Sequence, residues 1–133
     1  MPEPLAADEA RRMRIVSIGM LMGVLLFLGV ALLMRLTLTP QPVPIVSWFA
    51  VGFALLSPVI AGFVDRARPD RTARPGAPSP AFSRHLVAYA TLEAAGFLCA
   101  AALMVGESLL PFVAAAVPLG AMLLRFPRAS AAS

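Results

Sequence analysis

Four runs of apolar residues divide the chain, and short polar or charged stretches separate them. The first two runs, residues 15–34 and 45–64, each hold twenty residues without a charged side chain. The third run, 86–105, is equally long but contains Glu93, and the fourth, 109–124, has sixteen residues. Twenty residues at about 1.5 Å per helical residue reach about 30 Å, the thickness of the hydrocarbon core of a bilayer. The pattern therefore predicts four membrane-spanning helices.

The fold class that follows is all-α, a membrane bundle of four transmembrane helices. A backbone in lipid must satisfy its own hydrogen bonds, and a helix does so within one segment. The chain could form two like-oriented hairpins, because Pro58 and Pro118 take similar places in the second and fourth runs. A parallel repeat of this kind occurs in transporters, although the first and third runs match no better than chance. A cleaved signal peptide competes for the first run, whose length favours an uncleaved span.

Composition agrees with an integral membrane protein. Hydrophobic residues make up 59% of the chain and charged residues 14%, and the mean hydropathy is +0.84. A water-soluble domain is about half apolar and about a quarter charged, so the composition disfavours that class. All eleven basic residues are arginine, and the excess of Arg, Ala and Pro favours a GC-rich bacterial genome.

The arginines predict the orientation of the helices in the membrane. Ten of the eleven precede the first run, lie between the second and third runs, or follow the fourth, at Arg11, Arg12, Arg14, Arg66, Arg68, Arg71, Arg74, Arg84, Arg125 and Arg128. Only Arg35 lies on the other side. Because cytoplasmic segments carry the excess of basic residues, both termini are expected in the cytoplasm of a bacterium, with the helices in its inner membrane.

This orientation divides the chain into a cytoplasmic segment, 1–14, a membrane domain, 15–126, and a cytoplasmic tail, 127–133. The stretch 65–85 is expected to be a flexible Arg/Pro-rich cytoplasmic loop, whose arginines attract anionic lipid. The high isoelectric point, about 11.0, would also suit a nucleic-acid-binding protein. No aromatic residues are interleaved with the arginines, which flank apolar runs, so we expect no nucleic-acid partner.

One charged side chain, Glu93, lies within a predicted span. An intramembrane carboxylate is costly and usually faces a polar partner inside the bundle. Counting residues from the helix ends places Ser57 at about the same depth, and Tyr89 lies one turn away on the same helix. Pro58 and Pro118 are expected to kink their helices and to free a carbonyl each, of Ala54 and Ala114. These groups form a candidate polar intramembrane site.

Three roles for Glu93 remain open at this stage. The carboxyl group could hold two helices together by a hydrogen bond, take part in proton- or ion-linked transport, or contact an arginine of another subunit. Helix packing is expected at the small residues Gly19, Gly23, Gly96 and Gly120.

Catalytic and metal chemistry find no support in the sequence. The chain has a single His, His85, and a single Cys, Cys99, which lies in an apolar run and forms no intrachain disulfide. Without a second His, a Cys pair or an acidic cluster, we expect no metal site, no catalytic residues and no cofactor. One buried carboxyl group does not make an acid–base pair, so we expect that the protein is not an enzyme.

Two short motifs, at residues 89–97 and 124–127, resemble those of a family of small uncharacterised bacterial four-helix integral membrane proteins. Tyr89-Ala-Thr-Leu-Glu93-Ala-Ala-Gly-Phe is similar to the L-E-A-A-like box of that family's third helix, and Leu124-Arg125-Phe126-Pro127 is similar to the R-F-P end of its fourth helix. The stretch 15–27 is similar to its first helix. The chain departs from the pattern at Thr91, where an apolar residue is usual. The resemblance implies that Glu93 belongs to the pattern of the fold, and it implies no activity.

The function expected from the sequence is that of a non-enzymatic accessory or scaffold subunit, which packs against itself or a larger membrane complex. The alternative is a small oligomeric proton-linked transporter or channel that uses Glu93. Small multidrug-resistance transporters fit less well, because their essential Glu lies in the first helix. Rotary ATPase proteolipids also fit less well, because their termini face away from the cytoplasmic loop.

Overall fold

The computed structural model describes residues 7–37, 43–66, 76–106 and 108–127. These residues form helices and no strand, which confirms the all-α class for the described part of the chain. The helices are α1 (Ala7–Thr37), α2 (Pro44–Arg66), α3 (Pro80–Val105), α4 (Leu110–Ala114) and α5 (Ala116–Leu124). The predictions for Arg68, Arg71, Arg74, Arg128 and the tail beyond Pro127 lie outside the described residues.

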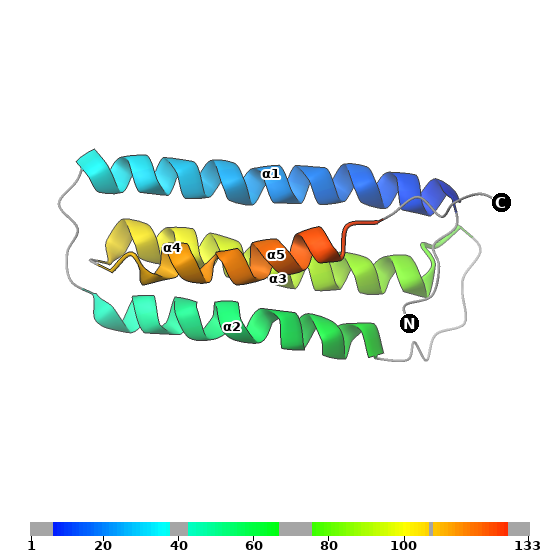
Figure 1. Cartoon of the computed structure of the whole chain (residues 1–133). Coiled ribbons are helices and arrows are strands. Elements are labelled where there is room, and N and C mark those ends of the chain that lie inside the picture. Colours follow the sequence, from blue (N-terminus) through cyan, green and yellow to red (C-terminus); the bar gives the residue numbers. More distant parts are fainter. Residues whose placement is uncertain (1–6, 38–42, 67–75, 107, 128–133) are drawn as a thin grey trace.

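The helices lie along one common axis, with α1 and α3 running in one direction and α2, α4 and α5 in the other (Figure 1). α3 lies in the middle and packs on α1 at one side and on α2 at the other, while α4 and α5 follow one another along α3. α1 and α3 begin at one end of the bundle, and α2 and α5 run toward that end, with α5 stopping short of it. We call this the arginine-rich end, because six described arginines lie there: Arg11, Arg12, Arg14, Arg66, Arg84 and Arg125.

Three helices, α1, α2 and α3, are long and apolar enough to cross a membrane. The apolar segment Leu110–Leu124, which contains α4 and α5, is shorter. Large apolar side chains cover the outside of the bundle, among them Leu26 at 71% exposure, Phe49 at 67% and Phe63 at 67%. Exposed apolar area on this scale marks a surface that other apolar material covers.

Small residues let the helices approach one another closely. The contact face of α2 consists of Ala50, Ala54, Ser57 and Ala61, all fully buried. Two groups of buried side chains fill the bundle, one around Val24, Leu28 and Leu103 and one around Met13, Tyr89 and Met122, the second nearer the arginine-rich end. Dispersion contacts between such closely packed helices stabilise a bundle whether its outside faces water or lipid.

The helices extend beyond the apolar runs at the arginine-rich end. α1 begins at Ala7, and Asp8 and Glu9 in its first turn suit the positive end of the helix dipole. α3 begins at Pro80, so residues 80–85 are helical and the expected loop 65–85 is shorter than predicted. Proline is tolerated at the first helical position, and the Ser79 hydroxyl accepts a hydrogen bond from the Phe82 N–H at 3.1 Å.

The two intrahelical prolines have different effects. The fourth apolar run is interrupted at Ala115, between α4 and α5. Pro118 has no N–H for the carbonyl of Ala114, which explains why the α-helix breaks one turn before the proline. α2 continues through Pro58, and the Ser57 hydroxyl donates to the carbonyl of Ala54 at 2.8 Å. Ser57 thus satisfies the carbonyl that Pro58 leaves free.

Candidate functional site

Glu93 lies at the seam between α3 and α1. Its Oε1 atom is 3.9 Å from the position that a Cβ at Gly23 would occupy, and the Phe97 ring is 3.7 Å from the same position. One turn further along each helix, the rings of Phe27 and Phe97 pack edge to face, with centroids 5.3 Å apart. Glu93 is partly buried, and no hydrogen bond or ion pair to it is found among the described residues.

Tyr89 and Ser57 are predicted to share a polar site with Glu93, but their hydroxyl groups form hydrogen bonds with other groups. The Tyr89 hydroxyl donates to the backbone carbonyl of Met122 in α5, and its ring is buried. Ser57 donates within its own helix, to Ala54. Each of the two hydroxyl groups therefore has a backbone partner of its own, and the structure joins neither of them to Glu93 by a hydrogen bond.

The four glycines expected at helix contacts differ in their surroundings. A Cβ at Gly96 would lie 2.6 Å from Val24 Cγ1, so the close approach of α1 and α3 requires a residue without a side chain at this position. Gly23 lies beside Phe97 and Glu93 at ordinary contact distance. A Cβ at Gly19 or Gly120 would meet nothing within 4 Å. Only Gly96 of the four makes a close approach in the described part of the chain.

Arg35 has a structural role that the sequence did not reveal. Its Nη1 atom donates to the carbonyls of Leu103 at 3.2 Å, Gly106 at 2.7 Å and Ser108 at 3.1 Å. The last carbonyls of a helix have no intrahelical partner and carry partial negative charge, so a cation there stabilises the end of α3. The only signal in the sequence was that Arg35 is the one basic residue between the first and second apolar runs.

Polar contacts join the helices at the arginine-rich end. Arg125, at the end of α5, forms an ion pair with Asp65 near the end of α2. Arg14 Nε donates to the carbonyl of Pro127 at 3.0 Å. Glu9 accepts from both groups of Ser79, from the backbone N–H at 2.9 Å and from the hydroxyl at 2.7 Å.

These contacts connect the first turns of α1 and α3 and the ends of α2 and α5. His85 is partly buried on α3, close enough to Asp65 and Arg125 to experience their charges. These hydrogen bonds and the ion pair join residues more than fifty positions apart in the sequence, so spacing along the chain gave no signal for them.

The described residues contain no group of His, Cys, Asp or Glu side chains that could hold a metal ion. Cys99 is buried and unpaired, with its thiol directed to the carbonyl of Ala50 at 3.8 Å. Comparisons with protein-family models, with curated proteins and with solved structures found no match for this chain. The proposals below therefore rest on its own residues and geometry.

Proposed function

We propose that the protein is a small multi-pass integral membrane protein that acts as a non-enzymatic accessory or scaffold subunit of a membrane complex. The observation that carries this proposal is the large exposed apolar surface of the bundle. Long apolar helices present bulky side chains outward along most of their length. The proposal places them in the inner membrane of a bacterium, with Leu110–Leu124 as a fourth, short span beside α3.

A short fourth span fits this proposal for a physical reason. Fifteen helical residues reach about 22 Å, less than the hydrocarbon core, so the bilayer has to thin locally around them. The segment lies against α2 and α3, and its buried residues Pro111, Ala114, Pro118 and Met122 face the bundle. Neighbouring helices thereby cover one side of its broken backbone.

The proposed orientation places the arginine-rich end in the cytoplasm, by the excess of basic residues in cytoplasmic segments. The test is cysteine labelling of intact cells in a Cys99→Ala background. Ala77→Cys and Ser108→Cys put an exposed thiol at opposite ends of the bundle. A membrane-impermeant maleimide is expected to label position 108 and to leave 77 unlabelled until the cells are opened. The reverse pattern would contradict the orientation.

An accessory role requires a partner. The direct test is gentle solubilisation of the native membrane, capture through the C-terminus, native mass measurement and protein identification. A larger partner present in fixed stoichiometry supports the accessory role. Copies of this chain alone, in a fixed small number, contradict a heteromeric complex and favour the second candidate below.

The second candidate is a small oligomeric proton-linked transporter or channel, and one observation favours it. Glu93 is partly exposed at the α1–α3 seam and has no hydrogen-bond or ion-pair partner among the described residues. A carboxyl group that has such access can exchange a proton, which a carboxyl group locked between two helices cannot do as readily.

Glu93→Gln distinguishes the two candidates. The amide has nearly the same shape, so an accessory subunit is expected to keep its complex and its effect. A proton-linked transporter or channel is expected to lose proton flux across the membrane while its assembly stays intact. Ala94→Leu is the matched control, because Ala94 is the exposed neighbour on the same helix and carries no proton. Equal loss of flux in both variants would contradict a role for the proton.

A further inference from the structure

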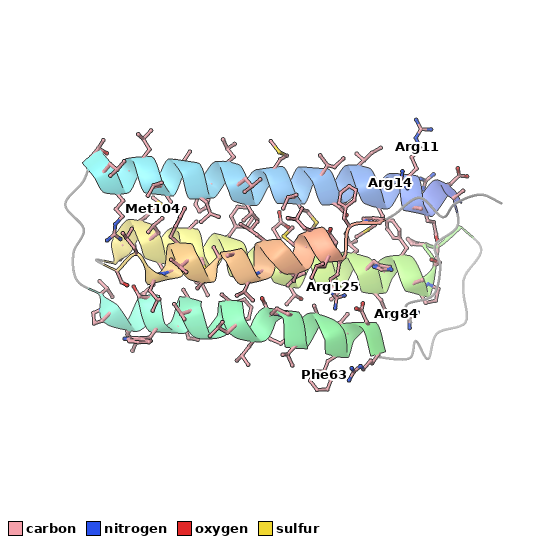
Figure 2. The ribbon with its side chains drawn as sticks, viewed as in Figure 1. Arg11, Arg14, Phe63, Arg84, Met104 and Arg125 are labelled. Carbon is pink, nitrogen blue, oxygen red and sulfur yellow. The ribbon has the colours of Figure 1, made fainter. Side chains whose placement is uncertain are left out.

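The outer face of α1 is an apolar stripe that begins at an arginine. Arg11 is followed at helical spacing by Ile15, Ile18 and Met22, which are 65%, 51% and 58% exposed. Residues three or four apart lie on one face of a helix, so these side chains form one outward row. Figure 2 shows Arg11 projecting away from the bundle at the arginine-rich end.

The outer face of α2 also carries an apolar stripe with an arginine at one end, but here the arginine follows the apolar residues in the chain. Leu56, Val59 and Phe63, exposed by 57%, 54% and 67%, lead along the helix to Arg66. Phe63 points away from the bundle on the side opposite Arg11 (Figure 2). Both outward apolar stripes therefore finish in an arginine, toward the same end of the bundle.

Arg12 is also exposed, but it begins neither apolar stripe. Arg11 and Arg66 differ in their contacts from Arg14, Arg35 and Arg125. Both are exposed, and neither has a hydrogen bond or ion pair among the described residues. Arg14 and Arg125 bind the carbonyl of Pro127 and the carboxylate of Asp65. At the opposite end, Arg35 is directed to backbone carbonyls of the chain.

The positions of Arg11 and Arg66 are fixed by the helices that carry them. Arg11 lies four residues before the apolar run of α1, about 6 Å along the axis, and Arg66 lies two residues after that of α2, about 3 Å. Glu9, two residues before Arg11, is bound to Ser79 at the start of α3. Both arginines thus belong to the ordered bundle.

We propose that Arg11 and Arg66 each bind the phosphate of an anionic phospholipid, whose acyl chain lies along the apolar stripe below. A guanidinium group pairs with phosphate through two parallel hydrogen bonds, and an apolar stripe that starts below it fits the attached chain. The inference rests on the proposed membrane insertion. Arg66 belongs to the stretch 65–85, to which the sequence analysis assigns anionic lipid, and in the structure it is the last residue of α2, whereas Arg11 lies outside that stretch.

The test uses the full-length protein in nanodiscs of phosphatidylglycerol and phosphatidylcholine with identical acyl chains, followed by native mass spectrometry of the retained lipids. We expect the wild type to retain phosphatidylglycerol preferentially. In the variant Arg11→Gln/Arg66→Gln, the ratio of phosphatidylglycerol to phosphatidylcholine bound at each site is expected to fall about fivefold. Arg71→Gln/Arg74→Gln is the matched control, because it removes the same charge from the loop, and it is expected to keep the preference.

Three results would overturn the inference. They are no headgroup preference in the wild type, equal losses in the two glutamine variants, and a loss in Arg11→Lys/Arg66→Lys as large as in the glutamine variant. Lysine keeps the charge and should keep most of the preference. A separate measurement tests the membrane insertion on which the inference rests: resistance to alkaline extraction from vesicles of phosphatidylcholine alone. Release of the wild type there would contradict the proposed function, whereas an integral wild type without headgroup preference would contradict only the lipid sites.

Discussion

Val24 of α1 packs directly onto the backbone of Gly96 in α3, so closely that a Cβ at Gly96 would lie 2.6 Å from Val24 Cγ1. Valine is branched at Cβ and has few alternative rotamers in a helix, so it cannot swing away at little cost. The contact fixes the distance between two helices at a point where both residues are buried.

Gly96→Ala is therefore expected to destabilise the protein. Overpacking of a tightly packed contact costs about 1–3 kcal/mol, and here the two helices must move apart or Val24 must leave its rotamer. The measurement is the unfolding free energy in detergent micelles by titration with a denaturing detergent. Gly120→Ala is the control, because a Cβ there meets nothing within 4 Å. It is expected to leave stability unchanged or to raise it by up to about 1 kcal/mol. Equal effects of the two substitutions would contradict the close contact.

Arg35→Gln is expected to loosen the turn between α3 and α4. The substitution removes a charged donor from three carbonyls, and a hydrogen bond to a charged group contributes about 1.5–3 kcal/mol. We expect faster amide hydrogen exchange in the last turn of α3 and a lower unfolding free energy. Arg12→Gln removes the same charge from an exposed position of the same helix and is expected to change neither quantity. Unaltered exchange near Gly106 in Arg35→Gln would show that the arginine does not hold this turn.

Tyr89→Phe is expected to weaken the attachment of α5 to α3. Phenylalanine keeps the buried ring but leaves the Met122 carbonyl without the phenol, at a cost of about 1 kcal/mol. Thr91→Val is the matched deletion of a hydroxyl group, because the Thr91 hydroxyl donates only to the carbonyl of Val87 in its own helix, at 2.9 Å. That variant is expected to be as stable as the wild type. The reverse order of stabilities would contradict the role given to Tyr89.

The helices themselves could be predicted from the sequence, because a long apolar run surrounded by apolar material has to satisfy its own backbone hydrogen bonds, and a helix does so within one segment. Their ends were less predictable. The composition of 65–85 predicts that Pro80 lies in a loop, yet proline is well suited to the first turn of a helix. The N-cap at Ser79 is recognisable only when the chain around it is known to be ordered. Ala7–Arg14 is helical in the structure although it precedes the apolar run.

The candidate site was less predictable than the fold. Counting residues placed Glu93 and Ser57 at a similar depth, but depth does not specify the direction in which a side chain points around its helix. In the structure the Ser57 hydroxyl turns back to the Ala54 carbonyl, and Tyr89 reaches α5. Long-range polar pairs such as Asp65 with Arg125 depend on how the helices are arranged, and no local pattern encodes that arrangement.

The central place of α3 has a consequence for the synthesis of the protein. α1 and α2 both find their main packing surface on α3, which follows them in the chain (Figure 1). A nascent chain emerges from the ribosome at about 5–20 residues per second, so for several seconds the first two helices exist without the helix that joins them. During that interval Val24 and the alanine face of α2 lack the surface on which they are buried in the finished bundle. The bundle can close only after translation has passed Val105, and truncation before that point leaves two helices without a core.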